Sequence, residues 1–168
     1  TYYMGRVAKG GLLDSEKIIQ AILNPKPIAW WGKGWSFFDA TRYAIREIDF
    51  VFAKLSKFHP DGEVVIADPT EKKESIQMEP NLRIASSTFI YIPKYSGIVF
   101  TTHPNHINEH QFGYRFAQII ANTYDDFFVD CTVNLISDLR TFAEKLSRLE
   151  GIYKIHAKVN PPNPLFGP

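Results

Sequence analysis

Three histidines lie within eight positions of the sequence, at His103, His106 and His110. If a helix begins by His106, then His106 and His110 lie one turn apart on the same face, as a pair of metal ligands requires. Glu109 directly precedes His110, so the His-Glu-x-x-His pattern of zinc proteases is absent. Two interpretations follow: a zinc or manganese site in a metal-dependent nuclease or hydrolase, or a solvated polar first turn that needs no cofactor. We favour the second.

A row of basic residues forms another candidate site. Lys154, His156 and Lys158 alternate with apolar residues, so they share one face of a predicted strand. A preceding predicted strand places Phe128 on the same outer face of the sheet. Alternating cations can follow the phosphates of a nucleic acid, and an aromatic ring can stack on a base. Lysines also protect exposed strands against edge pairing, but we prefer the nucleic-acid interpretation.

The stretch from Pro27 to Trp35 has three tryptophans among glycines and a lysine. An aromatic loop of this kind can stack on a base or another ligand, and it adds Trp30, Trp31 and Lys33 to the predicted nucleic-acid site. The alternative, which we favour for this stretch, is a loop whose tryptophans close one end of the core, where this residue type is usually found.

The elements that must position these residues are clearest late in the sequence. Residues 127–135 alternate between apolar and polar, residues 139–149 carry an apolar stripe at helical spacing, and residues 153–159 alternate again. This order predicts a ferredoxin-like strand–helix–strand unit. Two further helices are predicted, one capped by Asp14 or Ser15 and one just after Asn105; their apolar stripes comprise Ile18, Ile19 and Ile22, and Phe112, Phe116, Ile119 and Ile120.

Residues 37–102 are typical of an antiparallel β-meander, with a turn at residues 59–62 and a charged loop or protruding hairpin over residues 68–81. The predicted fold class is therefore α+β: a mostly antiparallel β-meander followed by a helix and the ferredoxin-like unit. We expect residues 1–168 to form a single domain. The start without methionine and the end at Pro168 predict that it is the amino-terminal part of a longer protein.

Composition limits the possible functions. A net charge of +1 over 168 residues provides no strong basic field, so any nucleic-acid site must be a local patch. The single cysteine, Cys131, cannot form an internal disulfide or a cysteine-based zinc cluster, and we expect it to be a small core residue. No apolar run reaches membrane-spanning length and no signal peptide is visible, which predicts a cytoplasmic protein with no membrane partner.

The run from Val159 to Gly167, Val-Asn-Pro-Pro-Asn-Pro-Leu-Phe-Gly, resembles a motif of an uncharacterised bacterial protein family of unknown function. Members of that family occur in mobile-element and phage-defence neighbourhoods, and the predicted element order is similar to the amino-terminal parts of some defence proteins. The resemblance implies no catalytic residues. No nucleophile elbow of the Gly-x-Ser-x-Gly type is present either, so we do not expect an enzyme.

We therefore predict a recognition domain of a bacterial defence protein that binds nucleic acid or a phage-derived partner. The alternatives are the histidine-based nuclease or hydrolase described above, and a homo-oligomerisation module whose aromatic residues form the interface.

Overall fold

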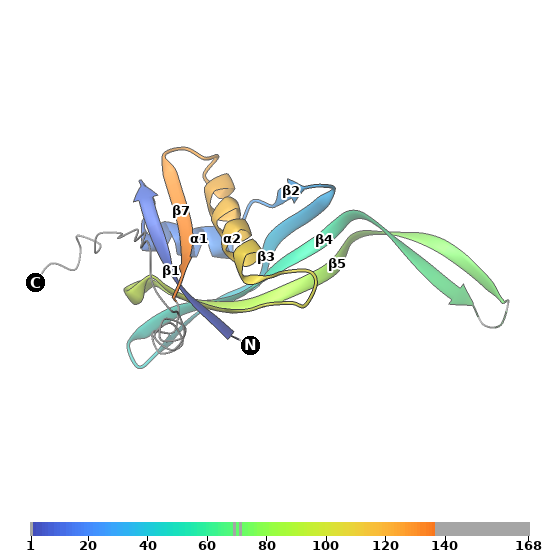
Figure 1. Cartoon of the computed structure of the whole chain (residues 1–168), viewed down its shortest axis with the longest axis horizontal. Coiled ribbons are helices and arrows are strands. Elements are labelled where there is room, and N and C mark those ends of the chain that lie inside the picture. Colours follow the sequence, from blue (N-terminus) through green and yellow to red (C-terminus); the bar gives the residue numbers. More distant parts are fainter. Residues whose placement is uncertain (1, 69, 71, 137–168) are drawn as a thin grey trace, which may run out of the picture. The chain divides into compact units, whose positions relative to one another are not determined.

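One antiparallel sheet, with strands in the order β2-β3-β4-β5-β6-β1-β7, organises the part of the chain that the structure describes (Figure 1). The computed structural model describes residues 2–68, 70 and 72–136. In chain order the elements are β1 (Tyr2–Gly11), α1 (Ser15–Leu23), β2 (Ile28–Trp30), β3 (Lys33–Ile45), β4 (Ile48–Asp68), β5 (Lys73–Ile92), the short 3-10 helix η1 (Pro93–Tyr95), β6 (Gly97–Thr101), α2 (Glu109–Thr123) and β7 (Val129–Leu135).

β1, the first strand of the chain, lies in the sheet between β6 and β7, the last two described strands. β1 pairs with β6, where Tyr3 is opposite Phe100, and with β7, where Val7 is opposite Val133. The prediction of a β-meander followed by a ferredoxin-like unit is therefore wrong, because β7 pairs antiparallel with β1 in one large sheet. Alternation shows that a strand has one buried face, but it does not identify the neighbouring strand. The predicted helix at 139–149 and strand at 153–159 lie outside the described residues.

The predicted turn at residues 59–62 is also wrong. The chain turns at Arg46 and Glu47, which both have positive φ, and β4 then runs through residues 59–62 so that Asp61 lies opposite Pro80 on β5. The pairing of β3 with β4 ends at Phe58. Beyond that point each residue of β4 has one neighbouring strand instead of two, a position where proline is tolerated.

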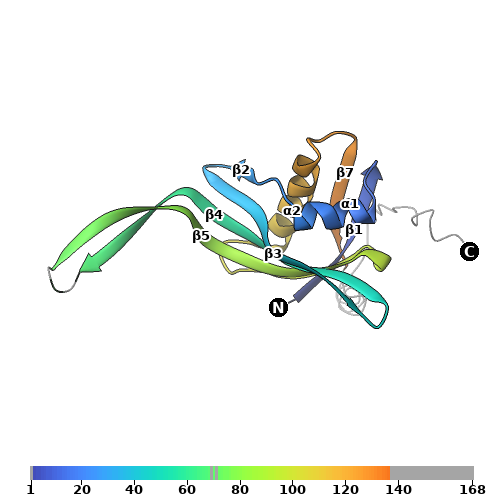
Figure 2. The same cartoon turned by 180° about the vertical axis from the view of Figure 1, so that it is seen from behind.

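Residues 59–68 of β4 and 73–82 of β5 thus form a two-stranded arm that extends past the other strands (Figures 1 and 2). The predicted loop or hairpin over residues 68–81 is the outer part of this arm, and most of it is strand. Val65 lies opposite Ile76, and Met78 follows on the same face; all three side chains are exposed.

Both described helices form over the apolar stripes that predicted them, but α2 begins at Glu109, later than the expected start just after Asn105. Asp14 caps α1 by accepting a hydrogen bond from the Lys17 backbone N–H, and Asn108 and Gln111 form a capping box at the start of α2. The stripes of both helices are buried. They meet the sheet in an aromatic core, in which Phe89 lies within 5.3–5.6 Å, between ring centroids, of Phe37, Phe112 and Phe116.

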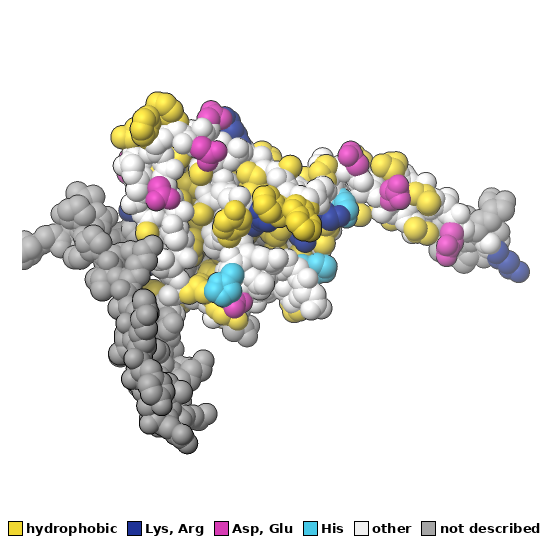
Figure 3. All heavy atoms as spheres, turned by 45° about the horizontal axis from the view of Figure 1, so that its top comes forward, with side chains coloured by type: hydrophobic (Ala, Val, Ile, Leu, Met, Phe, Trp, Pro, Cys, Tyr) yellow, Lys and Arg dark blue, Asp and Glu magenta, His cyan; other side chains and the backbone are white. Residues whose placement is uncertain are grey.

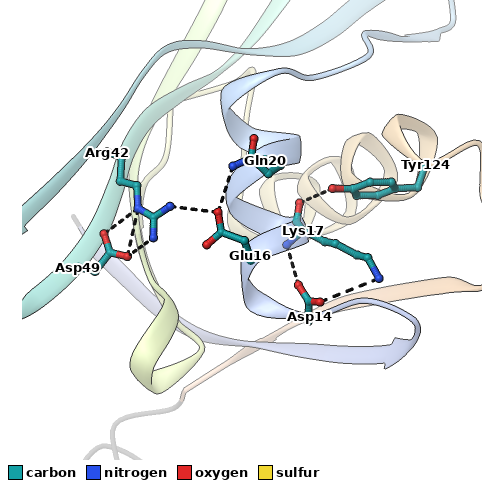
Figure 4. Close-up of polar contacts among 7 residues, drawn as sticks. All are labelled: Asp14, Glu16, Lys17, Gln20, Arg42, Asp49 and Tyr124. Carbon is teal, nitrogen blue, oxygen red and sulfur yellow. Dashed lines mark hydrogen bonds and ion pairs between the residues drawn. The ribbon is translucent and has the colours of Figure 1, made fainter.

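Polar contacts attach α1 to its surroundings (Figure 4). Arg42 on β3 forms a forked ion pair with Asp49 on β4, at 2.6 Å between Nη2 and Oδ2, and also contacts Glu16 on α1 at 3.1 Å. On the other side of α1, the Tyr124 hydroxyl donates to the Lys17 carbonyl at 2.7 Å. Through these contacts α1 connects the β3–β4 hairpin to the end of α2.

Candidate nucleic-acid interface

A tight turn between β2 and β3 presents an exposed indole. Trp31 and Gly32 both have positive φ, and Trp30 lies opposite Lys33, which defines a two-residue type I′ turn. Trp31 is 87% exposed. A bulky aromatic residue at positive φ is unusual, and glycine, asparagine or aspartate is preferred there. Packing therefore gives no reason for tryptophan at this position.

Beneath the turn, α2 brings a buried cation against the aromatic rings. The Arg115 guanidinium carbon lies 4.5 Å from the Trp30 ring centroid, 5.2 Å from Tyr114 and 5.3 Å from Trp35. Arg115 is only 7% exposed, and burial lowers the pKa of its guanidinium below the usual value. Ring faces attract cations, and three of them surround this charge.

Two more cations extend from the sheet on the same side. Lys57 on β4 lies opposite Trp35, with Nζ 5.5 Å from the ring centroid. Lys33 continues the face of β3 that carries Trp35, and its Nζ lies 3.0 Å from Nδ1 of His59. We call these residues the basic–aromatic cluster; its members are Trp30, Trp31, Lys33, Trp35, Lys57, His59, Tyr114 and Arg115.

The cluster has no acidic member. None of Lys33, Lys57 and Arg115 forms an ion pair with a carboxylate among the described residues, and Arg115 donates instead to Gln118. Figure 3 shows basic side chains among hydrophobic ones at the centre of one face, while the acidic side chains in this view lie apart from them. Arg115 Nε and Trp35 Nε1 are buried without a hydrogen-bond partner in the described part of the chain. The surface is thus locally cationic, although the chain is nearly neutral.

A hollow on the opposite face of the sheet differs in this respect. It has a volume of about 440 Å³ and is lined by Phe38 and Phe58 together with Lys54 and Arg83. Lys54 is held by Asp39 at 2.7 Å, so its charge is already compensated. The basic–aromatic cluster is therefore the stronger candidate for an anionic ligand.

The structure brings together only part of the site predicted from sequence. Trp30, Trp31 and Lys33 are members of the cluster. Phe128 is not on a strand: it lies in the connection between α2 and β7 at positive φ, exposed, with its ring 4.7 Å from that of Phe127. The predicted basic row of Lys154, His156 and Lys158 lies outside the described residues.

Sequence reasoning missed the members that come from other elements. Arg115 did leave a signal, because it falls between Phe112 and Phe116 on the buried stripe of α2, where an arginine is unexpected. Lys57 gave no signal, since its position opposite Trp35 depends on the register of β3 and β4.

The histidines are arranged differently from the predicted metal pair. α2 begins at Glu109, so His106 precedes the helix and is not one turn away from His110. The rings of His103 and His106 lie 5.2 Å apart, and His110 points to solvent beside Glu109. No group of three potential metal ligands is found among the described residues. The zinc or manganese site stays a prediction that this geometry does not support.

Comparisons with protein-family models, curated proteins and solved structures give no match for this chain. Neither described helix is long and apolar enough to cross a membrane. The case for a function therefore rests on the geometry of the cluster itself.

Proposed function

We propose that this domain binds single-stranded nucleic acid through the basic–aromatic cluster. The observation that carries the proposal is the combination of three cations without carboxylate partners and the tryptophans among which they lie. Cations of this kind pair with phosphates, and exposed rings stack on bases, which is how single strands are bound without sequence preference. No catalytic group is needed for this function.

The turn favours single strands over duplexes. Trp31 projects from a two-residue turn and is exposed on nearly all sides. Its ring can stack only on a base whose face is accessible, which is the situation in a single strand and not inside a duplex. Because the net charge is only +1, attraction must come from the cluster itself and not from a general basic field.

The direct test is fluorescence anisotropy with short labelled oligonucleotides, as single strands and as duplexes, over a range of salt concentrations. We expect single strands to bind more tightly than duplexes. The logarithm of the binding constant should fall with the logarithm of salt with a slope of about −2, since each phosphate contact on a single strand contributes about −0.7. Absence of binding at low salt, or binding that does not depend on salt, would contradict the proposal.

Homo-oligomerisation is a second candidate, favoured by the arm. A two-stranded hairpin is only marginally stable in water by itself, and this one exposes Val65, Ile76 and Met78 on one face. Light scattering tests it: the mass should rise with concentration, and Ile76→Asn should lower the mass. A monomeric mass at every concentration would eliminate this candidate.

The biological setting proposed here is bacterial phage defence, with a phage-derived protein as the other possible ligand. Both rest on the resemblance of residues 159–167 and not on the cluster. If the ligand is a phage protein and not nucleic acid, the anisotropy of the labelled oligonucleotides should not change at any salt concentration.

A further inference from the structure

A groove separates the two edges of the sheet. Figures 1 and 2 show α2 lying between β7 and β2, which are the last strands on either side. The space between them has a volume of about 900 Å³. Its walls come from Ile28–Trp30 on one side and Val129–Val133 on the other, and its floor is α2.

The β7 wall offers unpaired backbone groups. Phe128 accepts a hydrogen bond from Leu12, and Ile136 donates one to Met4, so even-numbered residues of β7 face β1. In an antiparallel pair, alternate residues direct their N–H and C=O groups to opposite sides. Val129, Cys131 and Val133 therefore direct these groups into the groove, with no partner strand among the described residues. On the other wall, Ala29 also directs its N–H and C=O groups into the groove, because the adjacent residue Trp30 bonds to β3 across the turn.

The floor leaves room for side chains. Gly113, Ala117 and Ala121 follow one another at four-residue spacing along the α2 face that lines the groove. A Cβ added at Gly113 would lie 3.3 Å from the Cβ of Val133, so the helix approaches β7 closely at this point. Beyond Gly113 the small residues leave space that larger side chains could fill.

One end of the groove is acidic. Asp126 and Asp130 line it, and neither carboxylate has a partner among the described residues; Lys26 pairs with Asp125 instead. A strand of five residues is about 16 Å long, the length of Val129–Val133. The groove therefore combines a free strand edge, a floor of small residues and uncompensated negative charge.

We infer that this groove takes an extended polypeptide segment that pairs with the free edge of β7, with alternating apolar side chains against α2 and a lysine or arginine beside Asp126 and Asp130. Strand addition of this kind obtains affinity from backbone hydrogen bonds and specificity from alternate side chains. The segment's apolar side chains lie on the same face as Cys131 and Val133, over Ala117. Its polar side chains lie beside Thr132 and Asn134. The ligand of this groove differs from that of the nucleic-acid site, because the groove recognises peptide backbone and positive charge.

The test uses the full chain, labelled with ¹⁵N, and a blocked peptide of sequence Lys-Val-Thr-Val-Thr-Val-Lys, in which the lysines share a face with the threonines, as Asp130 does with Thr132. Amide hydrogen exchange is followed residue by residue with and without the peptide. We expect the amides of Val129, Cys131 and Val133 to exchange at least about tenfold more slowly with peptide, since they gain hydrogen bonds. The amides that face β1 should not change. The same peptide with glutamate in place of both lysines should give much weaker protection.

Ala117→Leu should abolish the protection, because the larger side chain fills the floor while remaining a good helix former. His110→Leu, an exposed site on the same helix outside the groove, is the matched control and should protect as the native chain does. Unchanged slow exchange of the β1-facing amides shows that each variant is folded.

Three results would overturn the inference. Protection of the three amides in the free protein at every concentration means that the chain itself occupies this edge. Protection that appears only at high protein concentration means that a second copy occupies it. Exchange unaffected by millimolar peptide means that the edge takes no strand at all.

Discussion

The guanidinium carbon of Arg115 lies 4.5 Å from the centre of the Trp30 ring, at the junction of α2 with the β2–β3 hairpin. This contact joins a buried cation to an indole that is 43% exposed. Rings, and not a carboxylate, surround the charge on Arg115, so it remains available to attract an anion. The same contact explains how one helix residue can affect both the packing and the charge of the candidate interface.

Replacing Arg115 should separate these two roles. Arg115→Met keeps a long side chain among the rings, so we expect the free energy of unfolding to stay within about 1 kcal/mol of the native value. Arg115→Ala leaves a cavity among the rings and should cost about 2–3 kcal/mol. Both variants should bind single-stranded oligonucleotides more weakly. Urea unfolding and anisotropy measure the two effects, and equal destabilisation by both variants would contradict this prediction.

Trp31→Asn should improve the fold and impair binding. Asn-Gly is the preferred pair for a type I′ turn, so removing an aromatic residue from positive φ should raise the free energy of unfolding by about 1 kcal/mol. Losing one stacking ring should weaken oligonucleotide binding by between about 5- and 150-fold, the equivalent of 1–3 kcal/mol. Tyr95→Ser removes an exposed ring outside the cluster and should leave affinity unchanged. Unchanged affinity in Trp31→Asn would exclude stacking by this indole.

Lys57→Gln should reduce the salt dependence of binding. The substitution keeps most of the side chain over Trp35 but removes one charge. We expect the slope of log binding constant against log salt to become less steep by about 0.7. Lys94→Gln is the matched control, because Lys94 also lies over an aromatic ring, that of Tyr95, but outside the cluster. Equal changes in both variants would show that general charge, and not the cluster, attracts the oligonucleotide.

Asp49 should titrate at unusually low pH because of Arg42. Hydrogen bonds from Arg42 hold the pKa of the Asp49 carboxyl below its usual range. A folded-state pKa below the unfolded value of about 3.9 means that the pair stabilises the fold above that pH, and that the contribution is lost as pH falls through the folded-state pKa. Arg42→Met should raise the pKa of Asp49 toward its ordinary value, as measured by ¹³C NMR of the carboxyl carbon. Arg46→Met, in the neighbouring turn, should not change it.

Cys131 should react slowly with thiol reagents. Burial raises the pKa of its thiol to about 12, so the thiolate fraction at pH 8 is roughly a thousandfold smaller than for a free cysteine. Reaction with a disulfide reagent should be slow in the native chain and become fast in urea. Because the chain has only one cysteine, the released thiolate reports this site alone. Fast reaction in the native chain would show that the half-buried thiol is more accessible than its raised pKa implies.

The helices could be predicted from sequence because their determinants are local. The cap at Asp14 lies within a few residues of the stripe of α1, and the stripe of α2 predicted that helix without a cap. The alternation that predicted β7 is local too, and Val129–Leu135 is indeed a strand with Val133 packed toward α2. Patterns of this kind can be recognised in the sequence without knowledge of distant residues.

Strand order and the cluster depend on distant residues. Pro60 and Gly62 are typical of a turn, yet pairing with β5 keeps them in a strand. Composition pointed to Trp30 and Trp31, but nothing local places Arg115 under them, because that contact requires α2 to cross the hairpin. Residues that meet only through the tertiary fold are the ones that sequence patterns missed.

β1 is made before either of its neighbours in the sheet. Its partners begin at Gly97 and Val129, whereas β3, β4 and β5 each pair with the next strand to be made. On a ribosome the central hairpins can therefore form while β1 still waits with both edges open, and pairings so distant in sequence form slowly. We expect the docking of β1 to be the late step of folding, and a nascent chain stalled before Val129 to leave a strand edge exposed to aggregation.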